Sequence, residues 1–260
     1  MSEGQTLDVL FLGTAGCHAP ADEDTASYLV ADELLIDTGW QLRDRLKRFG
    51  RDPLAYQHLC LTHLHHDHMM GLPTFLYNHA AAGSLGELHL YGPPGLDKLV
   101  EQALALMDAD VYWPNLKRPQ IRQLRPGEGF ETPRLEVSTM ASLHPVPGLC
   151  YRIRDRQSGL SLGFGGDGAW QDELISFFAG CQALVLEHSL GLRKPEQNPH
   201  LHMDIIEAST LAREAGAAIL CPVHGPAAQR EACHQAAQRL FAGRIVWPRS
   251  GQVLKLGASG

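Results

Sequence analysis

Residues 62–68 constrain this chain more than any other feature. They read Thr-His-Leu-His-His-Asp-His, follow a short apolar run typical of a buried strand, and precede a helical pattern. In an extended segment residues two apart point to the same side, so His63 and His65 can share one metal ion. Where the chain turns into a helix, Asp67 and His68 point elsewhere and can reach a second ion. Imidazole and carboxylate groups ligate zinc and iron, so the segment predicts a metal site at a strand-to-helix junction.

Strands and helices alternate along the whole chain, and no linker or charge block divides it. We therefore expect one α/β domain spanning 1–260, with helices on the outer faces of two packed sheets. The basic residues within 43–51 are expected on a solvated helix face. Apolar runs predict strands at 7–13, 27–31, 33–36, 58–62, 87–91, 134–139, 149–154, 160–165, 183–187 and 218–223. Helical patterns occupy about 41–49, 70–82, 96–107, 172–179, 203–215 and 227–241.

The composition narrows the class of function and the compartment. A hydrophobic content of 44% can build a substantial core, and a net charge of −7 argues against bulk nucleic-acid or membrane binding. No run approaches the ~18 apolar residues of a membrane span, and the N-terminus does not resemble a secretion signal. The six cysteines form no CxxC pair, and Cys60, Cys150 and Cys221 lie in apolar runs as core residues. We expect a cytoplasmic protein.

Two metal ions need more ligands than residues 62–68 supply, and three later residues are suitable. His144 follows a predicted strand and precedes the rigid Pro-Val-Pro segment at 145–147. Asp167 follows an apolar strand within a glycine-rich turn, where the backbone can approach a crowded centre. His224 ends another apolar run. Polar groups at the ends of buried strands are typical of functional sites in layered folds, so we expect all three to be ligands.

In their order and spacing these residues resemble the metallo-β-lactamase superfamily, whose pattern is HxHxDH, a later His, an Asp after a strand and a final His. The resemblance runs from Phe-Leu-Gly-Thr at 11–14 and Leu-Ile-Asp-Thr-Gly at 35–39 to the last histidine. It implies an αββα sandwich of two mixed sheets, with two divalent ions at one edge, zinc first and manganese or iron as alternatives. Asp37 would orient the ligands through hydrogen bonds. By this resemblance one ion takes His63, His65 and His144, the other takes Asp67, His68 and His224, and Asp167 bridges them together with a water or hydroxide.

Within the superfamily the chain is most similar to the ribonuclease Z branch, through residues 62–73, 90–93, 144–146 and 151–153. That branch places a Glu–His pair beside its metals, and Glu187 and His202 hold the matching positions, with His202 opening a helix. Two departures stand out. The transfer-RNA-processing members carry a long arm where only residues 154–159 separate two strands here, and their Gly-Asp-Thr is Gly-Asp-Gly at 166–168. We therefore expect a substrate smaller than transfer RNA. The resemblance also suggests a homodimer.

The expected activity is hydrolysis of a small anionic phosphodiester or nucleotide. The positive charge of two divalent ions is larger than the negative charge of Asp67, Asp167 and a bridging hydroxide together. The centre would therefore carry a net charge of about +1, which favours binding of a phosphodiester anion. The hydroxide attacks the substrate, and Asp67 can accept a proton from the water that forms it. His202, held by Glu187, is the candidate acid that protonates the leaving alkoxide.

Three other functions remain open from the sequence. The same site could hydrolyse a carbonyl substrate, as a lactonase, a thioesterase or a β-lactam hydrolase, because the fold alone does not select the chemistry. A redox di-iron protein of this fold usually carries Glu where His65 stands, and it has a partner flavin domain. A non-catalytic metal-binding module is the fourth class. The Glu–His pair favours the phosphodiesterase, since expelling an alkoxide benefits from a dedicated acid.

Overall fold

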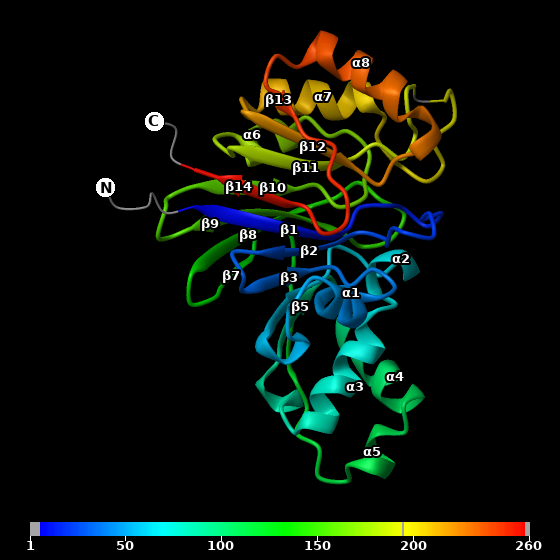
Figure 1. Cartoon of the computed structure of the whole chain (residues 1–260), viewed down its shortest axis with the longest axis vertical. Helices are drawn as coiled ribbons and strands as arrows, with labels where there is room; N and C mark the ends of the chain where they lie inside the picture. The colour runs from blue at the N-terminus through cyan, green and yellow to red at the C-terminus, as the bar shows by residue number, and fades with distance from the viewer. Residues whose placement is uncertain (1–5, 194, 258–260) are drawn as a thin grey trace.

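The computed structural model describes residues 6–193 and 195–257, which form two sheets of seven strands each, packed face to face (Figure 1). One sheet has the order β14-β1-β2-β3-β4-β5-β6 and the other the order β13-β12-β11-β10-β9-β8-β7. The strands of the first sheet are β1 (Leu7–Gly13), β2 (Ser27–Val30), β3 (Leu34–Ile36), β4 (His58–Cys60), β5 (His89–Gly92), β6 (Gln120–Gln123) and β14 (Val253–Leu256). Those of the second are β7 (Gly129–Glu131), β8 (Leu135–Ala141), β9 (Leu149–Asp155), β10 (Ser161–Phe164), β11 (Ala183–Glu187), β12 (Ile219–Val223) and β13 (Arg244–Ile245).

Both sheets are mixed and follow the same plan. In the first, β1, β2 and β3 pair antiparallel, and β3 to β6 pair parallel. In the second, β7 to β10 pair antiparallel, and β10 to β13 pair parallel. Neighbouring parallel strands end at the same edge of a sheet, so the loops that follow them meet there.

Apolar side chains fill three layers of packing. Residues from both sheets, including Phe11, Tyr28, Tyr151 and Phe164, form the core between them. Helices cover the outer face of each sheet (Figure 1), and on each of these two faces an apolar cluster packs the helices against the strands. This αββα sandwich confirms the predicted fold. On the first sheet lie α1 (Leu42–Arg48), α3 (Leu72–Ala82), α4 (Leu96–Leu106) and α5 (Ala109–Tyr112), with the short α2 (His66–Met69) preceding α3; on the second lie α6 (Glu173–Phe178), α7 (Ile205–Glu214) and α8 (Arg230–Leu240).

The two sheets are also joined by direct hydrogen bonds near the ends of β4 and β9. The Leu149 amide donates to the Thr62 carbonyl oxygen at 2.8 Å, and His63 forms a backbone bridge with Gly148. The buried Tyr151 hydroxyl donates to the carbonyl oxygen of Leu61 at 2.6 Å. These bonds fix the segment after β4 against the opposite sheet.

Several local predictions differ from the structure. The helix expected from position 203 begins at Ile205, because Asp204 caps it and pairs with Glu207 in a capping box; the preceding His202 therefore lies in a loop. Arg45, expected on a solvated face, is buried beside Asp24. The short elements β6, β7, β13, β14 and α5 were not predicted, since each offers too few residues for a clear period.

Two further observations concern the cysteines and the membrane. The prediction of core positions for Cys60, Cys150 and Cys221 is confirmed, because all three are buried free thiols. Among the described residues, no helix combines the length and the apolar character that crossing a membrane requires.

Candidate metal centre

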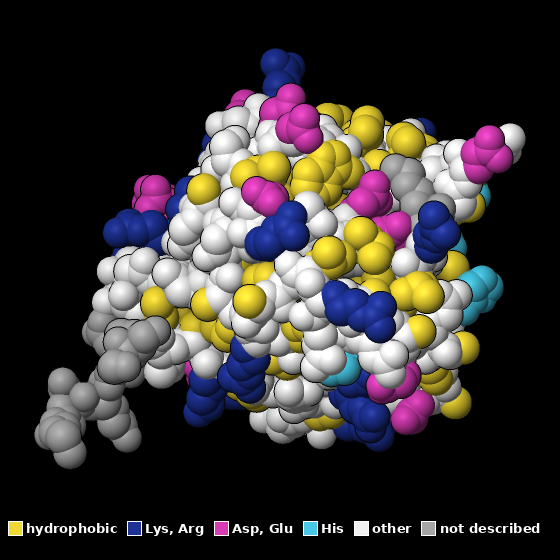
Figure 2. Space-filling model, turned by 90° about the horizontal axis from the view of Figure 1, so that it is seen from above, with side chains coloured by type: hydrophobic (Ala, Val, Ile, Leu, Met, Phe, Trp, Pro, Cys, Tyr) yellow, Lys and Arg dark blue, Asp and Glu magenta, His cyan; other side chains and the backbone are white. Residues whose placement is uncertain are grey.

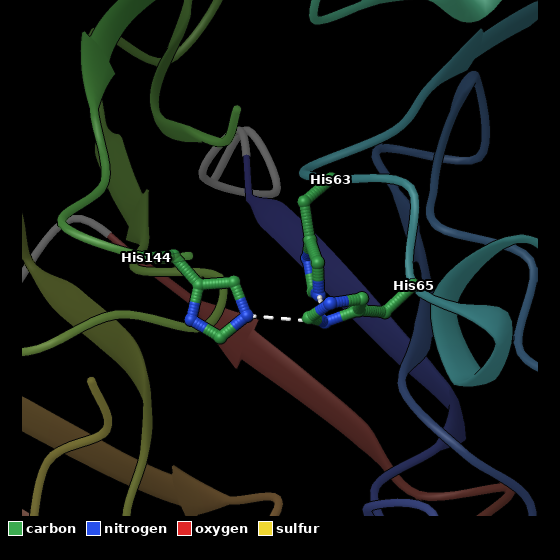
Figure 3. A group of neighbouring side chains, drawn as sticks. All are labelled: His63, His65 and His144. Carbon is green, nitrogen blue, oxygen red and sulfur yellow. Dashed lines mark hydrogen bonds between the residues drawn. The ribbon is translucent and has the colours of Figure 1, made fainter. Parts of the chain in front are cut away.

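Polar side chains gather at the edge where β4, β10, β11 and β12 end. His63 and His65 lie in the turn after β4, and α2 follows at once with Asp67 and His68. Another histidine, His144, comes from the loop between β8 and β9, and its ring faces those of the first two (Figure 3). The site is thus assembled from both sheets.

The first group of possible ligands consists of His63, His65 and His144. His65 Nδ1 lies 3.1 Å from His63 Nε2 and 3.1 Å from His144 Nε2 (Figure 3). One ring nitrogen carries either a proton or a lone pair, so it cannot satisfy both neighbours through hydrogen bonds. A tetrahedral ion with metal–nitrogen bonds of 2.0–2.1 Å keeps its ligand nitrogens about 3.3–3.4 Å apart. The three imidazoles therefore fit a metal ion well.

Two overlapping groups complete the centre, one formed by Asp67, His68 and His224 and the other by His63, His68 and Asp167. His224 Nε2 lies 3.1 Å from Asp67 Oδ2 and 3.3 Å from His68 Nε2. The Asp167 carboxylate faces two members of the first of these groups, since one oxygen is 3.5 Å from His68 Nε2 and the other 3.5 Å from His224 Nε2. The donor set of nitrogens and carboxylate oxygens suits a second ion.

Asp37 and Thr62 contact two of these rings at Nδ1, the ring nitrogen that faces away from the ligand cluster. Asp37 Oδ2 lies 2.9 Å from His68 Nδ1, and it also accepts the Thr62 hydroxyl at 2.8 Å. Asp37 Oδ1 accepts the Thr62 amide at 2.7 Å, and the Thr62 hydroxyl oxygen lies 3.1 Å from His63 Nδ1. Hydrogen bonds of this kind fix which ring nitrogen faces the centre. Asp37 thus makes the contact expected of a residue that orients ligands.

The buried Glu187 carboxylate links the loops around the centre. Its Oε1 accepts the His202 Nδ1–H at 2.8 Å and the Gly168 amide at 3.0 Å. Its Oε2 accepts the Ser189 amide at 2.8 Å. Donors occupy both oxygens, so hydrogen bonds from several segments hold the Glu187 carboxylate in place. His202 Nδ1 is also 3.8 Å from Asp167 Oδ2, which brings the His202 ring to the rim of the ligand cluster.

The pKa shifts divide the histidines of the cluster into two sets: nearby carboxylates, Asp167 foremost, outweigh burial and raise the pKa of His68 and His224, whereas the other three shift the opposite way. Burial lowers the pKa of His63, His65 and His144 below the ordinary histidine value, which favours the neutral imidazole that ligates a metal. Burial alone would raise the pKa of Asp67 and Asp167. Nearby histidines, His224 foremost, outweigh it and hold both pKa values below the ordinary range, so both carboxyl groups are ionised.

Every residue predicted as a ligand lies in these groups, and Glu187 and His202 lie beside them. His66, which the alternation points away from the centre, instead stacks on Trp40 with ring centroids 6.2 Å apart. The sequence reasoning missed Ser189, whose hydroxyl oxygen is 2.8 Å from His224 Nδ1. A serine after a strand is common in turns, and no spacing pattern marked this one.

Comparison with known proteins settles the family. A family profile described as "Beta-lactamase superfamily domain" matches residues 32–225, which is well over half of the chain. The chain belongs to the metallo-β-lactamase superfamily. The match includes all of the groups described above, and the membership predicted from the motifs is confirmed.

Relatives and solved structures agree with this assignment. Ribonuclease Z of Bacillus licheniformis is 27% identical over 157 residues, 58% of this chain and 50% of the relative, and its Bacillus subtilis counterpart is 29% identical over 156. The chain thus spans about half the length of the curated relatives it matches. The metallo-beta-lactamase fold protein YhfI from Bacillus subtilis has a TM-score of 0.82 and 24% identity, covering 96% of this chain and 100% of that one. Human tRNase Z, short form, has a TM-score of 0.76 and 19% identity, covering 95% and 98%. Both structures share the fold.

Proposed function

We propose that this chain is a metal-dependent phosphodiesterase that acts on a small anionic phosphodiester or nucleotide. The observation that carries the proposal is the Glu187–His202 hydrogen bond at the rim of a cluster that can hold two ions. Two divalent ions, zinc in the first instance, would lower the pKa of water toward neutrality and offset negative charge on phosphoryl oxygens. We also propose that one domain carries the whole site.

His202 is suited to protonate the leaving oxygen. Its Nδ1–H is held by Glu187, so Nε2 is the nitrogen that carries the transferable proton. Burial lowers the pKa of His202, but the hydrogen bond and the charge of Glu187 outweigh burial and raise the pKa above the ordinary value. A histidine whose pKa is raised in this way, placed at the rim of the site, can donate to an alkoxide as it departs.

Asp67 is suited to the opposite task. Nearby histidines hold its pKa below the ordinary range, so the carboxylate is ionised. It is the group that we propose accepts a proton from attacking water. It is almost fully buried, and one of its oxygens lies 3.1 Å from His224 Nε2. The two proposed proton-transfer groups therefore come from different sheets, Asp67 after β4 and His202 after β11.

Two observations favour a small substrate over a long RNA. β9 ends at Asp155 and β10 begins at Ser161, so no arm extends from this connection. On the face above α7 and α8, basic and acidic side chains are interspersed (Figure 2), whereas a nucleic-acid track needs clustered cations. The relatives named ribonuclease Z support phosphodiester chemistry. The described cysteines are free thiols, in keeping with the proposed cytoplasmic location. The suggested homodimer is a separate prediction, which sedimentation tests.

The test is hydrolysis of bis(p-nitrophenyl) phosphate by protein whose metal content is measured. We expect two ions per chain, and turnover that disappears on chelation and in Asp67→Ala. The matched control is His66→Ala, which removes an exposed histidine of the same motif whose ring stacks on Trp40; it should retain activity. Metal-loaded wild type that leaves diesters intact but opens lactones or thioesters would refute the proposal in favour of carbonyl chemistry.

The acid is tested with a poorer leaving group. Removing His202 should slow an alkyl phosphodiester by roughly 10²–10⁴-fold, the usual contribution of a general acid. It should spare the p-nitrophenyl ester, because p-nitrophenolate leaves without a proton. An equal loss on both esters would contradict the role given to His202.

A further inference from the structure

The Ser189 hydroxyl contacts His224 at two points. Its oxygen lies 2.8 Å from His224 Nδ1 and 3.0 Å from the carbonyl oxygen of the same residue. Ser189 lies two residues beyond Glu187, the last residue of β11, whose carboxylate accepts the Ser189 amide at 2.8 Å. The serine is therefore itself fixed in place, and its hydroxyl cannot turn away without breaking two bonds.

His224 needs such support, because its backbone is left-handed. Its φ is 56°, a conformation that non-glycine residues adopt at a cost in free energy. The His224 amide donates to the Thr14 carbonyl oxygen at 2.7 Å, and the Ser189 hydroxyl reaches the carbonyl on the other side. The peptide groups on both sides of the strained residue are thus held by hydrogen bonds.

The same contacts select the tautomer of the His224 ring. The Ser189 hydroxyl has one proton, and a carbonyl oxygen can only accept, so that proton goes to the His224 carbonyl. The hydroxyl oxygen then accepts from Nδ1–H. In the neutral ring, the form that a metal ion requires, this leaves Nε2 without a proton, facing Asp67 Oδ2 at 3.1 Å and His68 Nε2 at 3.3 Å. An unprotonated Nε2 is the form that ligates a metal ion.

We propose that Ser189 is a positioning residue for the ion held by Asp67, His68 and His224, acting through the orientation and tautomer of the His224 ring. The inference rests on the two-ion centre of the proposed function. Asp37 makes the corresponding contact with Nδ1 of His68, and Thr62 makes it with Nδ1 of His63. Those two residues follow strands of the first sheet, whereas Ser189 supports a ligand that follows a strand of the second sheet.

The proposal makes a selective claim. Ser189 touches a ligand of the second ion and none of His63, His65 and His144. Ser189→Ala should therefore lower the affinity for one of the two ions about tenfold to hundredfold, the usual effect of losing a residue that orients a metal ligand. The other ion should keep its affinity. Ser189→Thr, which retains the hydroxyl, should restore the wild-type pattern.

The experiment is a zinc titration of the full chain against a chromophoric chelator, which resolves the two binding steps. Ser209→Ala is the matched control, because Ser209 is a fully buried serine on α7 whose hydroxyl has no hydrogen-bond partner among the described residues. The proposal is overturned if Ser189→Ala lowers the affinity for both ions equally or leaves both affinities unchanged. It is also overturned if Ser189→Thr does not restore the wild-type affinities. A wild type that binds a single ion overturns it together with the two-ion centre.

A second measurement needs no variant, so it decides the matter even if Ser189→Ala fails to fold. Histidine ¹⁵N NMR of the zinc-loaded wild type should show His224 protonated at Nδ1 and ligating through Nε2. A proton at Nε2 of His224 contradicts the proposal. Neither test uses catalysis, so a chain that binds two ions as described but leaves diesters intact would refute the phosphodiesterase and leave the role of Ser189 standing.

Discussion

Gly16 gives a direct test of how rigidly the His224 ring is held. A methyl group added there would lie 2.9 Å from Cε1, 3.0 Å from Nδ1 and 3.2 Å from Nε2 of His224. Non-bonded carbon atoms need about 3.5–4.0 Å, so the ring or the loop must move by about 0.6 Å or more. Gly16 does not have a left-handed backbone, so Gly16→Ala introduces the contact without forcing the φ angle.

Neither side can move freely. The Thr14 carbonyl oxygen accepts the His224 amide, and Ala15 forms a bridge with Thr25, so the loop and the histidine are tied to one another. The displacement therefore falls on the ring. Metal–ligand distances tolerate only about ±0.2 Å, so we expect Gly16→Ala to weaken the ion shared by His224 about tenfold to hundredfold.

The measurement is the same chelator titration, with thermal unfolding of the metal-free protein to establish that the variant is folded. Gly257→Ala is the matched control, because no atom of the described residues lies within 4 Å of a methyl group added there. Two ions bound with wild-type affinity in folded Gly16→Ala would show that the ring can move aside, and would refute the reasoning.

Two other predictions concern stability and the candidate acid. Burial raises the pKa of the Asp155 carboxyl, but hydrogen bonds, chiefly from Arg134, outweigh burial and lower the pKa to about 2 from 3.8. Because folding lowers this pKa, the ionised carboxyl stabilises the folded protein by about 2 kcal/mol at any pH above its unfolded-state pKa of about 4. That stabilisation is lost as the pH falls from about 4 through the folded-state pKa of about 2. Urea unfolding should show this acid loss in wild type and not in Asp155→Asn; parallel curves would contradict it. The Asn198 side chain accepts the His202 amide at 3.1 Å and donates to the His202 carbonyl at 2.8 Å. Asn198→Ala should slow alkyl phosphodiesters by about tenfold to hundredfold and spare the p-nitrophenyl ester; equal losses on both would rule out action through His202.

The ligand cluster could be predicted because its members obey simple geometric rules. His63 and His65 alternate along an extended segment, and Asp167 and His224 follow apolar strands. Parallel strands bring such residues to one edge whatever their separation in sequence. The residues that support the ligands follow no such rule. Ser189 was missed because its partner, His224, lies 35 positions away and approaches only once β11 and β12 pair.

Two errors had different causes. The start of α7 could have been predicted, because Asp204 and Glu207 have the spacing of a capping box. The burial of Arg45 could not, because it depends on a carboxylate far away in the sequence. Asp24 is itself buried and accepts the Trp40 and Gln41 amides, which leaves it 3.9 Å from the Arg45 guanidinium. Whether a charged residue at a core-facing helix position is buried can be predicted only when the residue of opposite charge that pairs with it is known.

The hydrogen bonds that join the two sheets beside the site have a consequence for metal exchange. Through Leu149 to Thr62, and Tyr151 to Leu61, the segment that carries His63 is attached to the opposite sheet by the protein alone. The spacing of the ligands is therefore set by the polypeptide before any ion arrives. We therefore expect that an ion can leave and a different one can enter without local refolding, so that the metal bound in a cell would depend on the supply of ions as much as on the protein.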